Sequence, residues 1–349
     1  MNFKVLLRKN VFFCFFPLIW LLYSCSGIPV YEGLGLSTDP VPVMEELRTG
    51  ILPSGLRYFI LENSRPENRA YLSLAVKAGS VLENDDEQGL AHFVEHMAFN
   101  GTARFPEAEL VNYLRSLGMR FGPEVNAYTS YDETVYGIEV PVETGEDGIR
   151  RIPGTALAVL DDWTHAISFS QADVDDERLV ILEEHRSRLG ARERIRRQML
   201  PVLFKGSQYA VRYPIGLPEI IEGAPASRLE GFYRKWYQAD NMALIFVGDF
   251  DGAALEKSLE DHFTMPAPAV PVKLPRFDLP VPKKQQADVL ILTDPELSFT
   301  SVNLYFRRSR QAPRGDLAYY REGIINNLIN RMLNLRFNEK STKSETPYI

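Results

Sequence analysis

Hydrophobic and polar positions alternate in several short segments of the chain, and this alternation predicts β-strands. Residues 55–61 and 70–76 are rich in β-branched or aromatic residues, and Asn, Pro and Gly residues bound them. Residues 125–131 and 134–140 show the same pattern on either side of a short acidic turn. These last two segments therefore predict a β-hairpin.

Apolar residues at helical spacing predict several helices among these strands. Nearly every other residue around 89–102 is apolar, which predicts a helix that is buried on most sides. We predict a packing helix at 106–117, a long amphipathic scaffold stretch within 143–169, and a charged helix at 174–186. The core positions expected within 143–169 are Ile149, Ile152, Leu157, Leu160, Trp163 and Ile167.

Three side chains within one turn of the first of these helices are suited to a metal site. His92 and His96 are four residues apart, which is about 40° around a helix, and Glu95 is one step round on the same side. Two imidazoles at this spacing can bind one zinc ion, and the carboxylate can take a proton from a water on that metal. The order His-x-x-Glu-His is the inverzincin signature. The alternative is an amphipathic helix whose histidines are surface or hydrogen-bonded core residues.

A third zinc ligand is expected from elsewhere, because catalytic zinc usually has three protein ligands and one open position. In the helix at 174–186, Glu177 and Glu184 are seven residues apart and flank the apolar Val180 and Ile181. We predict Glu184 as the ligand and Glu177 as a carboxylate that orients a ligand. The alternative is that both are exposed glutamates of an ordinary charged helix.

His165 is predicted not to bind the metal, because no second ligand lies near it at metal-binding spacing.

The N-terminal 24 residues are typical of a bacterial secretion signal. A basic start precedes an apolar run of about a dozen residues, fewer than the roughly 20 that span a bilayer as a helix. The sequence Leu-Tyr-Ser-Cys at 22–25 resembles a lipobox and predicts cleavage before Cys25 and lipidation of its sulfur. The alternative is an ordinary signal with an incidental cysteine. Cys14 would be removed with the signal, so no disulfide within the chain is expected.

Composition narrows the classes of protein and partner that fit. A length of 349 residues with 45% hydrophobic content suffices for one large domain and part of another. The net charge of −7 is mild and unclustered, so we expect no nucleic-acid partner.

Five sequence blocks, in the same order, resemble the pitrilysin (insulinase) family of zinc metallopeptidases, which includes the mitochondrial processing peptidases. They are His-Phe-Val-Glu-His-Met-Ala-Phe-Asn-Gly-Thr at 92–102, Asn-Ala-Tyr-Thr-Ser at 126–130, Glu-Arg-Leu-Val-Ile-Leu-Glu-Glu at 177–184, and the segments 232–237 and 240–249. The resemblance covers the chain from about residue 50. It implies that His92, His96 and Glu184 bind zinc, that Glu95 is the general base and that Glu177 supports a ligand.

The resemblance also implies an α+β fold of repeated metallopeptidase domains. Each is a mostly antiparallel sheet with helices packed on one side, and complete proteins close like a clam-shell around unfolded peptides. The predicted divisions are a lipoprotein signal peptide at 1–24, a tether at 25–48, a catalytic zinc metallopeptidase domain at 49–265, a Pro-rich linker at 266–283, and the truncated start of a second homologous domain at 284–349. The last part is expected to contain strands at 288–293 and 298–306 and a helix at 317–337. A second family-like half or subunit would complete the chamber.

The predicted function is that of a zinc-dependent endopeptidase of the bacterial cell envelope that hydrolyses peptides or unfolded polypeptides. Each catalytic domain would bind one zinc ion. Attack of a zinc-bound water, assisted by Glu95, would cleave the peptide bond. Asn126, Ala127 and Tyr128 would pair with the substrate as an edge strand. Lipid on Cys25 would hold the protein on the periplasmic face of the outer membrane.

Two other classes stay open: a non-catalytic peptide-binding or assembly subunit of the same family, and a solute-binding lipoprotein. A solute-binding lipoprotein would not account for the His-x-x-Glu-His helix.

Overall fold

The computed structural model describes residues 39–106, 109–116, 119, 125–279, 288–306 and 315–342. The predicted signal peptide and Cys25 lie outside the described residues. The chain divides into two compact units, Val43–Arg310 and the flanking segments Met1–Pro42 with Gln311–Ile349, which are described separately. No helix among the described residues is long and apolar enough to cross a membrane.

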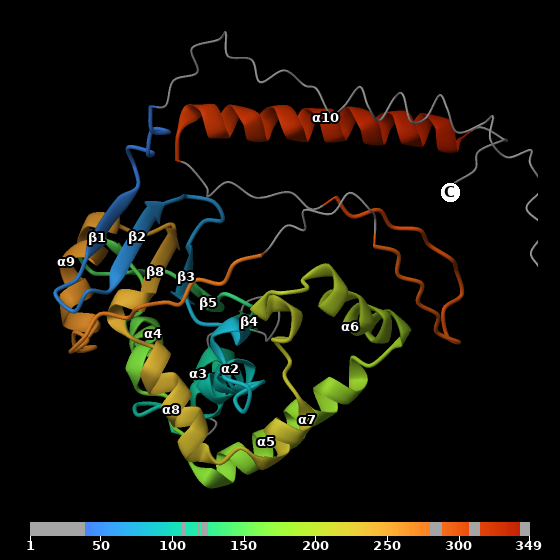
Figure 1. Ribbon diagram of the computed structural model, residues 1–349. Coiled ribbons are helices and arrows are strands. Elements are labelled where there is room, and N and C mark those ends of the chain that lie inside the picture. Colours follow the sequence, from blue (N-terminus) through green and yellow to red (C-terminus); the bar gives the residue numbers. More distant parts are fainter. Residues whose placement is uncertain are drawn as a thin grey trace, which may run out of the picture. The chain divides into compact units, whose positions relative to one another are not determined.

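A six-stranded sheet in the order β1-β2-β8-β3-β5-β4 forms the centre of the larger unit (Figure 1). Its strands are β1 (Arg48–Ile51), β2 (Arg57–Glu62), β3 (Arg69–Val76), β4 (Val125–Thr129), β5 (Thr134–Pro141) and β8 (Met242–Gly248). Strands β2 and β8 run parallel, and every other neighbouring pair is antiparallel. The mostly antiparallel sheet of the predicted α+β fold is thus confirmed, and β1 and β4 are its two edge strands.

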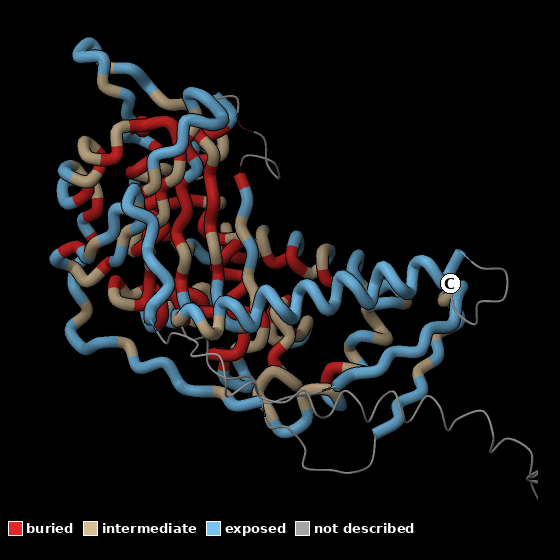
Figure 2. Tube along the Cα trace, turned by 90° about the horizontal axis from the view of Figure 1, so that it is seen from above, coloured by how far each residue is buried: buried red, intermediate tan, exposed pale blue. Residues whose placement is uncertain are grey.

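Helices pack against the sheet and cover buried residues of its strands. The helices of the larger unit are α2 (Leu90–Asn100), α3 (Glu109–Ser116), α4 (Gly154–His165), α5 (Gln171–Ser187), α6 (Ala191–Leu203), α7 (Pro218–Gly223), α8 (Ala226–Trp236) and α9 (Gly252–His262). Short 3₁₀ turns occur at η1 (Ser80–Leu82), η2 (Gln208–Ala210) and η3 (Ala239–Asn241). The buried residues concentrate in the strands and in the helix segments that face them (Figure 2).

Trp163 of α4 joins the sheet to helix α2 and is fully buried. Its indole Nε1 donates to the carbonyl of Ala98 at 2.9 Å, and its ring centroid lies 5.4 Å from that of Phe99 and 5.2 Å from that of Tyr136 in β5. The tryptophan thus fills the core and also satisfies its polar edge. This contact fixes the C-terminal half of α2 against the sheet.

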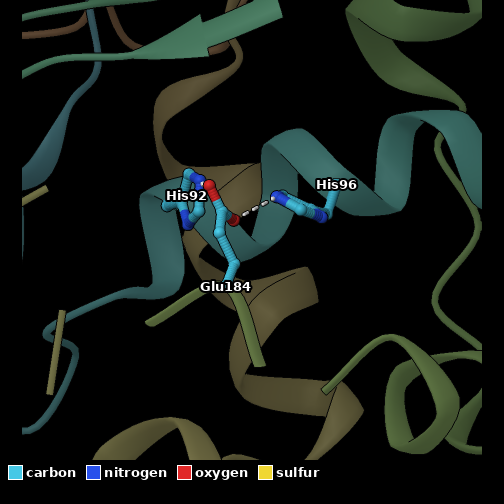
Figure 3. Close-up of side chains that lie close together, drawn as sticks. All are labelled: His92, His96 and Glu184. Carbon is cyan, nitrogen blue, oxygen red and sulfur yellow. Dashed lines mark ion pairs between the residues drawn. The ribbon is translucent and has the colours of Figure 1, made fainter. Parts of the chain in front are cut away.

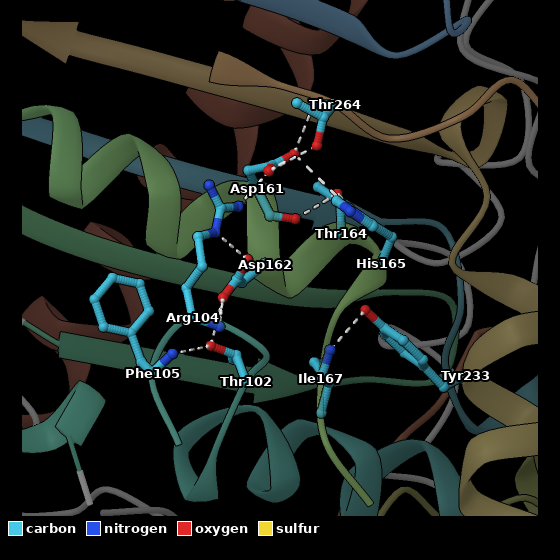
Figure 4. Close-up of polar contacts among 10 residues, drawn as sticks. All are labelled: Thr102, Arg104, Phe105, Asp161, Asp162, Thr164, His165, Ile167, Tyr233 and Thr264. Atoms are coloured by element: carbon cyan, nitrogen blue, oxygen red, sulfur yellow. Dashed lines mark hydrogen bonds and ion pairs between the residues drawn. The ribbon is translucent and has the colours of Figure 1, made fainter. Parts of the chain in front are cut away.

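Two buried carboxylates of α4 hold the chain segment that follows α2 (Figure 4). Asp162 accepts hydrogen bonds from Thr102 Oγ1 at 2.6 Å and from the backbone N and Nε of Arg104 at 3.0 and 2.6 Å. Asp161 pairs with the same guanidinium and accepts from the backbone N of Thr264 at 3.0 Å. Buried charges need such partners, so this network specifies where α2 ends.

The region 143–169, predicted to contain a long amphipathic scaffold stretch, is helical only in its second half. Strands β6 (Glu143–Thr144) and β7 (Arg150–Arg151) form a small hairpin, and α4 begins only at Gly154. Gly148 adopts a φ of 75°, which glycine accepts readily, and Pro153 occupies the N-cap. Proline disfavours helical geometry in the residue before it, so a helix cannot run through this point. The five predicted core positions from Ile152 onward are buried, whereas Ile149 is half-buried.

The strands predicted at 288–293 and 298–306 do not form in the described residues. Their alternating apolar residues are largely exposed, as in Ile291, Val302 and Phe306. A strand needs a neighbour for its backbone groups, and the described residues offer none here. The helix predicted at 317–337 does form, as α10 (Leu317–Ser341) in the smaller unit.

Candidate metal centre

The N-terminal end of α2 is fixed by a side chain that precedes it. Oε1 of the buried Glu83 accepts hydrogen bonds from the backbone N–H groups of Gly89 and Ala91 at 3.1 and 2.9 Å. These groups have no partner within the helix, so Glu83 serves as a cap for it. Gly89 has a φ of 109° and lies so close to Gly216 that a Cβ on Gly216 would be 2.2 Å from its Cα. Helix α2 therefore enters the core in one defined position.

Helix α5 is fixed by Arg178, a buried residue six positions before the predicted ligand Glu184. Its guanidinium donates to the carbonyls of Ile221 and Ala224 at the end of α7 and pairs with Asp175 at 2.9 Å. Ile181 is buried on the same side of α5, but Val180 is 53% exposed, contrary to the predicted face. The buried face of α5, which includes Arg178 and Ile181, is thus rotated slightly away from Val180, and Glu184 still points toward α2.

The two helices bring His92, His96 and Glu184 together (Figure 3). The Oε2 atom of Glu184 lies 3.6 Å from His92 Nε2 and 3.4 Å from His96 Nε2. The side chains are 8, 21 and 24% exposed, respectively. The ligand atoms all lie within 4.8 Å of one another, so three residues far apart in sequence share one small site.

These donor atoms fit a zinc ion. Zinc bonds of about 2.0–2.1 Å in tetrahedral geometry separate two ligand atoms by about 3.4 Å, which is close to the distances found here. Glu184 Oε2 is buried and has no hydrogen-bond partner among the described residues, although it points between two imidazoles. Two nitrogens and one carboxylate oxygen also match the donor set of a catalytic zinc site with an open fourth position.

Glu177 fixes the ring of His96 from behind. Its Oε1 lies 2.7 Å from His96 Nδ1, and its Oε2 accepts from Asn100 Nδ2 at 2.8 Å. A carboxylate on Nδ1 favours a proton on that nitrogen, which leaves Nε2 free to face Glu184. Glu177 thus selects the tautomer that a metal ligand requires.

In the metal-free site the pKa of one imidazole is lowered and the pKa of the other is raised. Burial and the charge of His96 lower the pKa of His92 to about 4. Burial also disfavours the charged form of His96, but its hydrogen bond to Glu177 and its close contact with Glu184 outweigh burial and raise its pKa to about 9. His96 therefore carries a proton at neutral pH when no metal is present, and zinc must displace that proton.

Glu184 remains ionised under all ordinary conditions. Its close contact with His96, together with the charges of His92 and Arg188, outweighs burial and lowers its pKa to about 2. Arg188 forms an ion pair with Oε1, the oxygen that does not face the imidazoles. One oxygen is thus engaged by a guanidinium, and the other is directed at the metal position.

Glu95 lies in the same helical turn and is 92% buried, and the hydroxyl of Thr129 in β4 donates to its Oε2 at 2.6 Å. Burial raises the pKa of Glu95, while the bond from Thr129 and the charge of His96 act against that rise. A carboxylate with a raised pKa beside a metal position is suited to accept a proton from water.

The segments that carry this site match a known peptidase family. The family model described as insulinase (peptidase family M16) matches residues 58–204, and the model described as peptidase M16 inactive domain matches residues 224–340. The chain belongs to peptidase family M16.

Several M16 relatives are named zinc proteases. The probable zinc protease PqqL of Haemophilus influenzae is 34% identical over 330 residues, which cover 95% of this chain and 34% of the relative. The zinc protease PQQL-like protein of Arabidopsis thaliana is 35% identical over 304 residues, or 86% of this chain and 31% of the relative. The chain spans about a third of the length of these curated relatives.

Solved structures of the family agree with the fold. The first half of the periplasmic protease PqqL from Escherichia coli superposes with a TM-score of 0.63 at 37% identity. This match covers 69% of the present chain and 50% of that structure. A structure of the periplasmic protease PqqL from the same organism gives the same score and identity, with 26% of that chain covered.

In this M16 member His92, His96 and Glu184 form one cluster, and Glu177 contacts His96. Glu95 lies in the same helical turn and contacts the predicted substrate strand through Thr129. Asn126 and Tyr128 are exposed on β4, and Ala127 is half-buried. His165 lies apart from the metal position and contacts Thr164 at 2.9 Å. The roles assigned to all these residues stay predictions.

The sequence analysis missed Thr129, Arg188 and Asn100. Arg188 had a detectable signal, because it follows Glu184 by one helical turn and could reach its carboxylate. Asn100 and Thr129 become partners of Glu177 and Glu95 only through tertiary packing.

Proposed function

We propose that this chain carries the zinc site of an endopeptidase that hydrolyses peptides or unfolded polypeptides in the bacterial cell envelope. The observation that carries the proposal is the convergence of His92, His96 and Glu184, with Glu95 in the same helical turn. The zinc-protease names of the M16 relatives support the reaction class. One zinc in the domain at 49–265 is expected, with Glu177 orienting His96.

Zinc, when bound there, would lower the pKa of a water molecule and polarise the carbonyl of the substrate. Glu95 would accept the proton of that water and pass it to the leaving amine, which is the usual work of a buried carboxylate general base. Its burial favours the protonated form that the second half of the cycle needs. Glu184 and Glu177 would keep the two imidazoles in ligand geometry throughout.

Strand β4 is the part of the site suited to hold a peptide. It is one of the two edge strands of the described sheet, and its partner β5 occupies only one of its sides. An extended peptide could pair with the backbone of Asn126, Ala127 and Tyr128, and the main-chain bonds would tolerate many sequences. Because Thr129 at the end of β4 contacts Glu95, a paired peptide would pass close to the base.

We also propose that the protein is exported and attached through lipid on Cys25 to the periplasmic face of the outer membrane. The lipobox-like sequence supports lipidation, and the description of Escherichia coli PqqL as periplasmic supports export. A Pro-rich linker at 266–283 would lead to a second domain from 284, and a second family-like half or subunit would complete the chamber. The lack of regular structure at 266–279 is consistent with a linker.

Two substitutions test the proposed chemistry in the full-length protein. Glu95→Gln should retain zinc and lower the cleavage rate of an internally quenched peptide by at least about 100-fold. His92→Ala should lose both zinc and cleavage, because it removes a ligand. Glu183→Gln is the matched control, since that exposed residue of α5 pairs only with Arg186 among the described residues and should remain fully active. Full peptidase activity in Glu95→Gln would refute the mechanism.

The second candidate is a non-catalytic peptide-binding or assembly subunit, and the match to the M16 inactive-domain model at 224–340 favours it. In that case the wild-type protein would bind the quenched peptide without cleaving it, whether or not zinc is present. The same assay therefore decides between the two functions.

A further inference from the structure

The hydroxyl of Thr129 has one proton, and its surroundings show where that proton goes. Thr129 Oγ1 lies 2.6 Å from Glu95 Oε2 and 3.3 Å from Thr134 Oγ1. Thr134 donates its own proton to the carbonyl of Ala78 at 2.8 Å, so it does not donate to Thr129. The shorter contact, to a carboxylate, is also the stronger one. Thr129 therefore donates to Glu95 and engages one of its two oxygens.

The same short segment anchors both partners of this bond. The carbonyl of Ala78 holds Thr134, which lies opposite Thr129 in the β4–β5 register. The backbone N–H groups of Ser80 and Val81 donate to the carbonyls of Ser130 and Tyr131 at 3.1 and 2.9 Å, which fixes the end of the hairpin. Glu83, at the end of this segment, caps the helix that carries Glu95. Residues 78–83 thus set the position of β4 relative to α2.

We propose that Thr129 is a positioning residue, which holds Glu95 by Oε2 so that Oε1 is the oxygen that accepts the proton of the attacking water. This inference rests on the proposed peptidase function. The bond also links the general base directly to the strand that would hold the peptide, because Thr129 is the last residue of β4. An error in the orientation of Glu95 would slow proton transfer without altering zinc binding or peptide pairing.

Three variants of the full-length zinc-loaded protein test this role, with an internally quenched peptide as substrate. Thr129→Val keeps the branched shape that suits a strand and removes the hydroxyl, so kcat should fall about tenfold while KM stays within about twofold. Thr129→Ser restores the hydroxyl and should recover kcat to within about threefold of wild type. Ser130→Ala is the control, because its hydroxyl bonds only within the hairpin turn and should be dispensable.

A second measurement separates positioning from a structural effect. In the metal-free protein, which cannot cleave, fluorescence anisotropy of a labelled peptide should give the same Kd for wild type and Thr129→Val. Zinc affinity from chelator competition and the melting temperature should also be unchanged. A weaker peptide Kd that accounts for the lost activity would overturn the proposal, because Thr129 would then act through substrate pairing.

The remaining outcomes are equally decisive. If Thr129→Val keeps kcat within about twofold of wild type, or if Thr129→Ser does not recover it, the positioning role is wrong. When the wild type cleaves and Glu95→Gln does not, a failure of the Thr129 variants to behave as expected rejects the positioning role and leaves the peptidase function standing. If the zinc-loaded wild type cleaves nothing, the peptidase function fails and the inference fails with it.

Discussion

Replacing Glu177 with glutamine should weaken zinc binding, because Glu177 holds the ring of His96 in ligand geometry. Its two oxygens accept from two different donors, His96 Nδ1 at 2.7 Å and Asn100 Nδ2 at 2.8 Å. A glutamine of the same length has one carbonyl oxygen, so its NH₂ group must face one of these donors. The substitution therefore removes a negative charge and also creates one donor–donor contact.

The expected magnitude follows from the burial of this pair. Loss of such an outer partner usually lowers metal affinity by 10–100-fold, which is about 1.4–2.7 kcal/mol. The Glu177 side chain is only 15% exposed, so water compensates little for the lost bond, and we expect the upper part of that range. In the metal-free protein the pKa of His96, about 9, should fall, because the bond to Glu177 is one of the two contacts that raise it against burial.

Two measurements check this prediction. Competition with a chromophoric chelator gives the zinc affinity, and an NMR titration of the metal-free protein gives the pKa of His96. Glu183→Gln on the same helix is the control, since its carboxylate pairs with the exposed Arg186 and should leave both quantities unchanged. A zinc affinity within about twofold of wild type in Glu177→Gln would show that this carboxylate does not orient the ligand.

Two further outcomes are expected. Zinc affinity should rise about tenfold per pH unit up to about pH 9, because the metal-free His96 has a pKa of about 9 and zinc must displace its proton. Chelator competition at several pH values measures this dependence. A zinc affinity that does not change with pH contradicts the prediction. Cys25→Ser should move the exported protein from the membrane fraction to the soluble fraction and abolish labelling with a fatty acid, and retention of both would reject the lipid anchor.

The sequence predicted best those features that local geometry determines. The positions of His92 and His96 follow from one turn of helix, and Glu177 and Glu184 follow from two turns of another. The alternation in β2, β3, β4 and β5 likewise depends on a period that neighbouring residues define. Within the amphipathic stretch expected at 143–169, local rules also explain why helix α4 begins only after Gly148 and Pro153.

Features that depend on contacts between distant segments were not predictable from one sequence. Thr129 and Glu95 meet because residues 78–83 hold both the hairpin and α2, and nothing in the spacing of the two residues indicates this. The strands expected at 288–306 fail for a related reason. Their alternating pattern shows which side chains could face a core, but a partner strand must supply the hydrogen bonds.

The charges around the candidate metal position are suited to a divalent cation. Glu184 faces it, Glu177 lies behind the ring of His96, and Glu95 lies in the same helical turn. With the guanidinium of Arg188, which pairs with Glu184, these groups carry two formal negative charges when all three carboxylates are ionised and both imidazoles are neutral. Such an excess in a largely buried site is costly, and the metal-free protein reduces it by protonating His96. A zinc ion would neutralise it completely and free that imidazole to act as a ligand. The proton on His96 is therefore a weaker substitute for the metal, and the two compete for the same carboxylates.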